Sequence, residues 1–415
     1  MEVLFPRCAG LDVHKKVVVA CVRIVEDAKV ALAIRSFETT TRSLLLLSEF
    51  LSEHNVTHVA MEATGVYWTP VWHVLEGHFE LILANAAHIK NVPGRKSDVN
   101  DATWIADLLA HGLIRSSFVP PAPIQDLRAL TRTRKQLVRE IAQHTLRIQK
   151  TLEDANLKLD NVVTDILGMT GRRILEAIVA GESDPEKLSE LSCGSLKKER
   201  VALREALGGQ IRTSHRFLLG QHLRLIDALS SSLQAIDQQV GECLRPFEQA
   251  ASVLETIPGV GPIVARVIIA EIGVDMSRFP TAGHLRSWAG LCPRMDESAG
   301  KHRSTRMRKG APWLKTTLIQ AAWCAVRTKG CYLRALYGRL KGKRGSKKAI
   351  GAVAASMLTA VYYMLRDGVP YQDLGADFFE RRDTHKTLTR LIRRIEQLGH
   401  VKVRLEAIAD TPCAA

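Results

Sequence analysis

Two carboxylates, Asp98 and Asp101, stand three residues apart where a helical pattern begins. Side chains at that spacing lie on one face of a helix, so both acids can point into one site. Two carboxylates this close repel each other unless a hydrogen bond, a shared proton or a cation lies between them. Hard divalent cations prefer such oxygen ligands. Taken alone, the pair also fits solvated acids, which the helix dipole favours at a helix start.

Two further acids are associated with apolar, strand-like runs. Asp12 lies inside the run 9–13, and Glu62 directly follows the run 56–61. A buried carboxylate costs several kcal/mol unless it is paired or bound to a metal. An edge-strand Asp that points to solvent is the alternative for Asp12. Glu62 is at the carboxyl end of its strand, which is the usual place for a site in an α/β sheet.

The elements that must position these acids follow one another in a regular order. Alternation and apolar runs predict strands, and 3.6-residue periodicity predicts helices. The expected order is strand 9–13, strand 17–22, strand 30–37, helix 41–54, strand 56–61, helix 69–77, strand 79–84, loop 85–95 and a helix from residue 101 to 111. This pattern predicts an α/β domain with acids in the first strand, at the end of the fourth strand and as a pair at the start of the last helix.

The composition points to a folded protein with a polyanionic partner. The chain has 415 residues, is 46% hydrophobic, and carries a formal net charge of +15 with a pI of about 9.6. That length predicts two or three domains, and the positive excess favours a partner made of phosphates. We find no long apolar span and no signal peptide, so we expect no membrane partner and a cytoplasmic location. Eight scattered cysteines without zinc-ligand spacing are expected to be reduced and mostly buried.

A proline-rich break at 118–123 precedes a long basic helix expected over 124–159. Its cations include Arg128, Arg132, Arg134 and Lys135. They could contact nucleic-acid phosphates, or form the solvated face of a coiled-coil helix, and both interpretations stay open. A second long helix, expected over 214–245, suggests an antiparallel hairpin or a dimerisation arm.

The C-terminal part holds a glycine-punctuated turn and a basic loop. Gly259 and Gly261 lie in the segment 254–265, which is similar to a helix-hairpin-helix element that approaches DNA phosphates; a plain tight turn is the alternative. Ser298 stands in a small-residue loop that could let a serine approach a phosphate as a nucleophile. The basic residues that follow it, Lys301, Arg303, Arg306, Arg308 and Lys309, could hold that phosphate. By chemistry alone, a simple phosphate contact by this loop is the commoner case.

The strand order and the acid positions resemble the RNase H-like fold of the RuvC type. Three blocks, at 10–13, 61–67 and 96–102, are similar to the signature blocks of the DEDD insertion-sequence transposases, the IS110 family, and the block 287–322 resembles the C-terminal domain of the same family. The resemblance implies that Asp12, Glu62, Asp98 and Asp101 are the catalytic, metal-binding acids. It implies two Mg²⁺ ions as cofactors, with Mn²⁺ as the alternative. Carboxylates of this kind can form a clamp for phosphoryl transfer.

The same resemblance assigns the family's motif serine to Ser298. Many family members have Ser-Ser-Gly where this chain has Glu297-Ser298-Ala299-Gly300, so Ser304 stays a second candidate. Family members are DNA recombinases of bacteria, and some are directed by a structured bridge RNA. The resemblance therefore implies DNA and a structured guide RNA as partners and a nucleoid-associated location. A serine and an acidic site in different domains favour a homo-oligomer, a dimer or a tetramer, with composite sites.

The sequence thus predicts an α/β RNase H-like (RuvC-like) N-terminal domain at 1–120, a mainly α-helical coiled-coil arm at 121–250, a C-terminal helical transposase domain at 251–345 and a helical extension at 346–415. Lys96 is added to the basic residues above as an expected nucleic-acid contact. The predicted function is that of a metal-dependent transposase or recombinase with a serine nucleophile. The first alternative is a metal-dependent, structure-selective nuclease of the Holliday-junction resolvase type. The second is a non-catalytic nucleic-acid scaffold.

Overall fold

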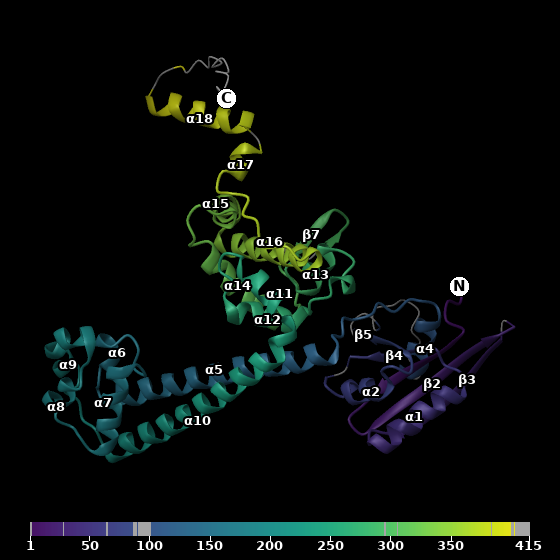
Figure 1. Cartoon of the computed structure of the whole chain (residues 1–415), viewed down its shortest axis with the longest axis horizontal. Helices are drawn as coiled ribbons and strands as arrows, with labels where there is room; N and C mark the ends of the chain where they lie inside the picture. Colours follow the sequence, from purple (N-terminus) through teal and green to yellow (C-terminus); the bar gives the residue numbers. More distant parts are fainter. Residues whose placement is uncertain are drawn as a thin grey trace. The chain divides into compact units, whose positions relative to one another are not determined.

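The computed structural model describes residues 2–27, 29–63, 65–85, 89, 101–293, 296–304, 306–382, 384–399 and 402, without the side chains of 296–298, 302, 303, 385–387 and 390. The chain divides into two compact units, Met1–Val119 and Pro120–Ala415 (Figure 1). This division falls within the proline-rich break. The expected boundaries at 250 and 345 lie inside the second unit and stay predictions.

The first unit is built on a five-stranded mixed sheet. Its strands are β1 (Arg7–Val13), β2 (Val17–Glu26), β3 (Lys29–Glu38), β4 (His58–Glu62) and β5 (Glu80–Ala84). They lie in the order β3-β2-β1-β4-β5. The first three form an antiparallel meander, whereas β4 pairs in parallel with both β1 and β5. This order and mixture of directions is compatible with the RNase H-like fold that the sequence predicts.

Helices cover both faces of the sheet. On one face, Ala9, Leu11 and Val13 of β1 pack in one core cluster with buried residues of α1 (Thr41–Glu53) and α2 (Trp68–Leu75). On the other face, Cys8 and Ala60 pack with α4 (Asp101–Ala110). Because successive strand residues point to opposite faces, the even-numbered residues of β1 and β4 face α4.

Gly10 lets α4 lie directly on β1. A Cβ atom at this position would be 2.2 Å from the carbonyl oxygen of Ala102 and 2.4 Å from the amide nitrogen of Ala106. The first turns of α4 therefore touch the backbone of β1, which only glycine permits. Arg23 of β2 and Asp107 of α4 form an ion pair at 3.0 Å, which adds a polar tie between the same helix and sheet.

The second unit contains a long helical hairpin. It is formed by α5 (Ala122–Asp154) and α10 (Thr213–Leu244), which lie side by side in Figure 1. Arg134 pairs with Asp237 near one end, and His215 contacts Asp154 near the other. Contacts with this reversed order mean that the helices run antiparallel. The antiparallel hairpin suggested by the sequence is therefore present, whereas its expected coiled-coil character is not tested.

Between α5 and α10 the chain forms a small helical tip, where the sequence indicates a smaller helical segment without its individual helices. It contains α6 (Leu159–Val162), α7 (Met169–Ala180), α8 (Pro185–Glu190), the short helix η1 (Gly194–Glu199) and α9 (Arg200–Ala206). Buried residues of these segments and of the adjoining ends of α5 and α10 form one hydrophobic cluster. The tip therefore has a core of its own.

The remaining described chain is mainly helical. It comprises η2 (Arg245–Phe247), α11 (Glu248–Glu255), α12 (Pro262–Ile272), η3 (Met276–Arg278), α13 (Ala282–Trp288), the hairpin of β6 (Asp296–Ser298) and β7 (Lys301–Ser304), α14 (Pro312–Ala325), α15 (Tyr332–Arg344), α16 (Ser346–Asp367), α17 (Phe378–Arg381) and α18 (Thr384–Gly399). By length and composition α16 alone in the described chain could cross a membrane, but 56% of its apolar window is buried. It packs against α11, α13, α14 and α15, which makes it a core helix.

The cysteines follow the expectation in part. Cys8, Cys21 and Cys331 are buried, three others are half-buried and Cys324 is exposed, while Cys413 lies outside the described residues. All seven described cysteines are free thiols. Burial raises the pKa of Cys8 to about 12, so this thiol stays protonated at neutral pH.

Candidate active site

Asp12 and Glu62 occupy matching places on neighbouring parallel strands. Leu11 of β1 pairs with Met61 of β4, and the two acids are the next residues along these strands. Neighbouring strands lie about 4.8 Å apart, so the backbones of the two acids are close. Leu11 and Met61 point into the α1 and α2 face, so both acids are on the α4 face.

Asp101 joins them from the helix that covers this face. It is the first residue of α4 and directly precedes Ala102, whose carbonyl oxygen touches Gly10. Gly10 lies two residues before Asp12 on the same face of β1. The close packing at Gly10 therefore brings the start of α4 to the part of the sheet that carries Asp12.

The environments of these acids are polar and partly open to solvent. The Asp12 side chain is 22% exposed, and its Oδ2 lies 3.0 Å from Nε2 of His14. Glu62 is half-buried and Asp101 is exposed. The sequence did not single out His14, although its place two residues after Asp12 on the same face of the chain was a usable signal.

The structure describes only three of the four acids predicted to form the site. Asp98 and Lys96 lie outside the described residues. Among the residues that are described, no three His, Cys, Asp or Glu side chains lie close enough to hold a metal ion together. The donor set of Asp12, Glu62 and Asp101 consists of carboxylate oxygens, which suit a hard ion such as Mg²⁺ and not a soft one. The roles of all four acids stay predictions.

Ser298 ends a strand of a tight hairpin, whereas the sequence led us to expect a loop. It is the last residue of β6 and pairs with Lys301, the first residue of β7. The two turn residues, Ala299 and Gly300, have φ angles of 49° and 74°. Positive φ at both positions is the pattern of a type I′ turn. A left-handed conformation is uncommon for alanine and costs about 1 kcal/mol or more, as at many functional sites.

The basic segment after this hairpin is exposed but firmly anchored. Lys301, Arg306, Arg308 and Lys309 are exposed, while the side chain of Arg303 lies outside the description. Its end is fixed by Gly310, whose Cβ would be 2.4 Å from the amide nitrogen of Gly290. The exposed cations are therefore available to a phosphate backbone, and their contacts stay predictions.

The glycine turn expected to resemble a helix-hairpin-helix element does join two helices, α11 and α12. Its two glycines differ. Gly259 has a φ of 84°, and a Cβ there would be 2.4 Å from the carbonyl oxygen of Ala321 in α14, so this glycine serves packing. Gly261 precedes α12 and faces open space. Of the two glycines, only Gly261 leaves room for a nucleic-acid backbone to approach.

The cations predicted on α5 divide into two groups. Arg128 donates to the carbonyl oxygens of Ala270 and Glu271 at 3.0 and 2.6 Å. Arg132 forms two hydrogen bonds of 2.8 Å with the carboxylate of Glu271, which is 1% exposed. Arg134 forms two hydrogen bonds with Asp237. These three arginines hold α5 to α12 and α10, so their predicted contact with nucleic acid gains no support from their geometry.

Lys135 and its surroundings form the second group. Its Nζ donates to Oγ1 of Thr316 at 2.7 Å and lies 5.7 Å from the ring centre of Trp313. Arg139 approaches the same ring at 5.6 Å. From the sequence, Arg139 is one of the cations of the predicted basic helix but is not among the selected nucleic-acid contacts, and Trp313 is not singled out. Arg139 follows Lys135 by four residues and so shares its helix face, which was a readable signal; Trp313 is joined to them only by the fold.

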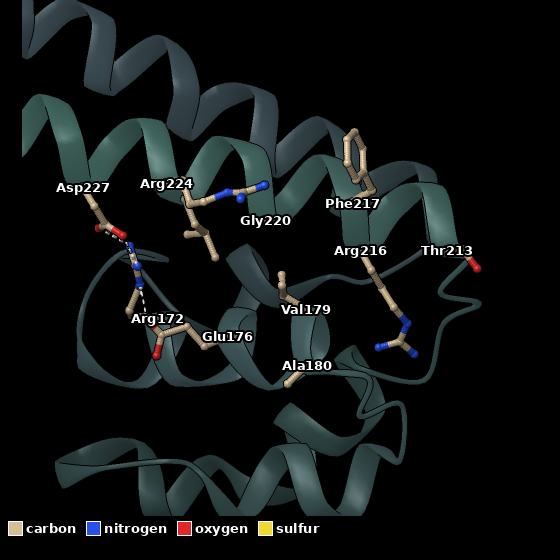
Figure 2. A pocket seen from close by; sticks show the side chains of 11 residues that line it. Arg172, Glu176, Val179, Ala180, Thr213, Arg216, Phe217, Gly220, Arg224 and Asp227 are labelled. Carbon is tan, nitrogen blue, oxygen red and sulfur yellow. Dashed lines mark hydrogen bonds and ion pairs between the residues drawn. The ribbon is translucent and has the colours of Figure 1, made fainter.

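One pocket of the described chain lies at the tip, between α7 and α10, and Figure 2 shows its lining. Its volume is about 660 Å³. On one side, Arg172 bridges Glu176 and Asp227 with hydrogen bonds of 2.6 to 2.8 Å. Arg216 is bound to carbonyl oxygens at the end of α7. The pocket contains none of the residues predicted to act on DNA.

The mixed sheet, with acids at neighbouring strand ends and a third on the helix that covers them, is compatible with an RNase H-like domain. Comparison with known proteins identifies the family. A model of the DEDD transposases of the IS110 type matches residues 9–156. A model described as the transposase IS116/IS110/IS902 family matches residues 251–338. Together these segments cover more than half of the chain, which belongs to the IS110 family of transposases.

Individual relatives are more distant. A 43.6 kDa protein of insertion element IS110 from Streptomyces coelicolor is 30% identical over 36% of this chain and 38% of its own length. A pilin gene-inverting protein of Moraxella bovis is 30% identical over 34% of this chain and 46% of its own. The transposase for insertion sequence element IS1111A of Coxiella burnetii is 25% identical over 68% and 70%. The chain thus matches less than half of the length of the first two.

Proposed function

We propose that this protein is an insertion-sequence transposase that cuts and rejoins DNA strands, with a metal-bound acidic site and Ser298 as the nucleophile. The observation that carries the proposal is that Asp12 and Glu62 stand at neighbouring strand ends on the face of the sheet that α4 covers, with Asp101 as the first residue of α4. Membership in the IS110 family supports it. The pilin gene-inverting relative is by its name a protein that inverts DNA, which agrees with strand exchange.

The four acids Asp12, Glu62, Asp98 and Asp101 would hold Mg²⁺, with Mn²⁺ as the substitute. The bound metal supplies Lewis-acid activation of a phosphate and stabilisation of the leaving oxygen. His14 would keep the Asp12 carboxylate oriented through its Nε2 contact. The tight approach of α4 at Gly10 keeps the start of this helix next to β1.

The serine step conserves the number of phosphodiester bonds. Oγ of Ser298 attacks a DNA phosphorus atom and forms a phosphoserine ester, while the bond from that phosphorus to one sugar oxygen breaks. The serine proton passes to a carboxylate or to water, and the leaving sugar oxygen takes up a proton. In the reverse step the hydroxyl of another strand attacks the ester and frees the serine. Lys301 and the exposed cations after it would hold the phosphate.

A structured guide RNA and a homo-oligomer, dimeric or tetrameric, belong to the same proposal. The family resemblance and the net charge of +15 support an RNA partner. The separation of Ser298 from the acids by roughly two hundred residues or more supports composite sites made by several chains. A nucleoid-associated location would follow from binding DNA.

A covalent-adduct assay tests this function. The full chain, purified with any accompanying RNA, is mixed with DNA that contains the element's junction and with Mg²⁺. We expect a denaturation-resistant protein–DNA species in the wild type that is absent from Ser298→Ala and from Asp12→Ala. Ser304→Ala is the matched serine control, and it should still form the adduct.

Other outcomes would separate the alternatives. Cleavage without any adduct, lost only in Asp12→Ala, would show a hydrolytic nuclease and reduce Ser298 to a phosphate contact. An adduct that survives in Ser298→Ala but not in Ser304→Ala would move the nucleophile to Ser304. If Asp12→Ala binds DNA as the wild type does and no form of the protein cleaves DNA, the result would support the non-catalytic nucleic-acid scaffold.

A further inference from the structure

Three cations of α5 surround the ring of Trp313, near the start of α14. The guanidinium carbon of Arg132, Nζ of Lys135 and the guanidinium carbon of Arg139 lie 5.7, 5.7 and 5.6 Å from the ring centre. Their spacing of three and four residues puts them on one face of the helix. We call these three side chains and Trp313 the Trp313 cluster.

The positive charge of the Trp313 cluster exceeds the negative charge beside it. The carboxylate of Glu271 is already engaged by two hydrogen bonds from Arg132 and lies 4.0 Å from Arg128. Lys135 donates to neutral hydroxyl groups of threonines. The side chain of Arg139 is exposed, and it forms no hydrogen bond or ion pair with any described residue.

Like charges held together in a partly buried place destabilise one another. Burial is the main cause that lowers the pKa of Lys135, and the neighbouring Arg139 lowers it further, whereas Glu271 opposes the shift. The Trp313 ring attracts the cations, but it carries no net charge and cannot neutralise them. A bound anion would offset the repulsion.

The Trp313 cluster also continues a basic surface. Trp313 follows the exposed cations Arg306, Arg308 and Lys309 within a few residues along the chain. Nζ of Lys315, in the first turn of α14, donates to the carbonyl oxygen of Arg308 at 2.8 Å and ties this segment to the helix. The segment begins at the hairpin that carries Ser298. A nucleic-acid strand that follows these cations would reach Trp313.

We infer that Lys135, Arg139 and Trp313 form a docking site for a phosphodiester group of the DNA substrate, outside the reacting phosphate. Lys135 and Arg139 contact the phosphate oxygens, and Trp313 holds both cations in place from beneath. Arg132 is the anchor that joins this site to buried Glu271. The inference rests on the proposed function, since it takes DNA as the substrate.

The test measures binding of the full chain to a labelled DNA duplex of random sequence over a range of salt concentrations. At about 0.1 M salt we expect Arg139→Ala and Lys135→Ala each to weaken binding about five- to tenfold. Each should reduce the slope of log affinity against log salt by about one, which is the signature of a lost phosphate contact. Arg139→Lys should retain most of the affinity.

The matched control is Lys150→Ala, which removes an exposed cation from the same helix. It should change affinity less than twofold, because a single solvated charge outside the contact contributes little. Equal losses in Lys150→Ala and Arg139→Ala would overturn the docking site. So would a loss of RNA binding in Arg139→Ala with DNA binding unchanged. The unfolding midpoint of Arg139→Ala should not fall below that of the wild type, because the change relieves repulsion among these cations, whereas the loss of a merely structural cation would lower the midpoint.

Binding and chemistry can be separated with one more protein. Ser298→Ala should bind the duplex as the wild type does. If it also forms the adduct, the proposed chemistry fails while the docking site stands. If the adduct behaves as proposed but Arg139→Ala binds normally, the docking site fails alone.

Discussion

The acids of the sheet unit and the cations of α5 were both selected from the sequence as functional groups, yet the structure treats them differently. Asp12, Glu62 and Asp101 gather on one face of one sheet. The cations of α5 separate into arginines bound to Glu271 and Asp237 and a pair, Lys135 and Arg139, without a carboxylate partner of its own. Strand position therefore predicted the shared face of the acids, whereas helix position did not identify the role of each cation.

The reason is physical. A strand end in a parallel pair has a fixed neighbour, because register places Asp12 beside Glu62 once the strands pair. A cation on a long helix acquires its role from whatever packs against that helix. Arg128 and Arg132 are structural because the buried acid of α12 lies opposite them. No feature of the α5 sequence predicts the position of Glu271.

The largest expected effect is loss of DNA cleavage when an acid of the sheet unit is neutralised. Glu62→Gln and Asp101→Asn should each reduce the cleavage rate by about 10³-fold, since metal-based charge stabilisation contributes several kcal/mol and each 1.36 kcal/mol is tenfold. Single-turnover cleavage of junction DNA in Mg²⁺ measures this. Glu49→Gln, an exposed acid of α1 on the opposite face, should cleave normally. Normal cleavage by Glu62→Gln would remove it from the site.

The next effect concerns how closely α4 packs on the sheet. Gly10→Ala should lower the free energy of unfolding by about 3 kcal/mol, because the new Cβ would meet backbone atoms of Ala102 and Ala106 that cannot move separately. Chemical denaturation measures it. The control is Gly241→Ala in α10, where a Cβ meets nothing within 4 Å. That change should stabilise by roughly 0.5–1 kcal/mol. A stable Gly10→Ala protein would mean that α4 does not rest on β1.

A smaller effect should separate the two groups of α5 cations. Glu271→Gln should cost about 2 kcal/mol, because it leaves Arg128 and Arg132 without their buried carboxylate. The value is below that of a fully buried pair because the Arg132 side chain is 37% exposed. Arg139→Ala should not lower the unfolding midpoint, because it removes a cation that its neighbours repel. If both variants were equally unstable, the division into structural and ligand-binding cations would fail.

Much of the fold could be read from the sequence because its signals are local. The five strands, α1, α5 and α10 all lie where periodicity predicted them, within a few residues at each end. The tip was predicted only as one smaller helical segment, because its individual helices are short and share one core. The β6–β7 hairpin was missed because Ala299, unlike asparagine or aspartate, is not a usual residue for a turn with positive φ.

The site was predictable only where chemistry and strand ends coincided. Asp12 and Glu62 stood out as acids in apolar surroundings. Trp313 could not be found, since its link to Lys135 and Arg139 spans more than 170 residues and depends on α14 packing beside α5. Long-range contacts of this kind produce no recognisable periodicity in the sequence of either segment.

The smallest expected effect lies in the arm, where His144 of α5 and His222 of α10 face each other with their Nδ1 atoms 3.1 Å apart. Burial, then His144 and Arg147, lower the pKa of His222 below its ordinary value of 6.5. The folded arm thus takes up this proton less readily than the unfolded chain does. Stability should therefore be unaffected at higher pH and should fall as the pH drops below 6.5.

Thermal unfolding between about pH 5 and about pH 8 measures this dependence. His222→Gln should reduce the loss of stability below pH 6.5, because only one histidine then remains at this place and no second imidazole can become charged beside it. If His222→Gln loses as much stability at acidic pH as the wild type does, other groups cause that loss. The arm would then owe none of its pH response to the histidine pair between its two long helices.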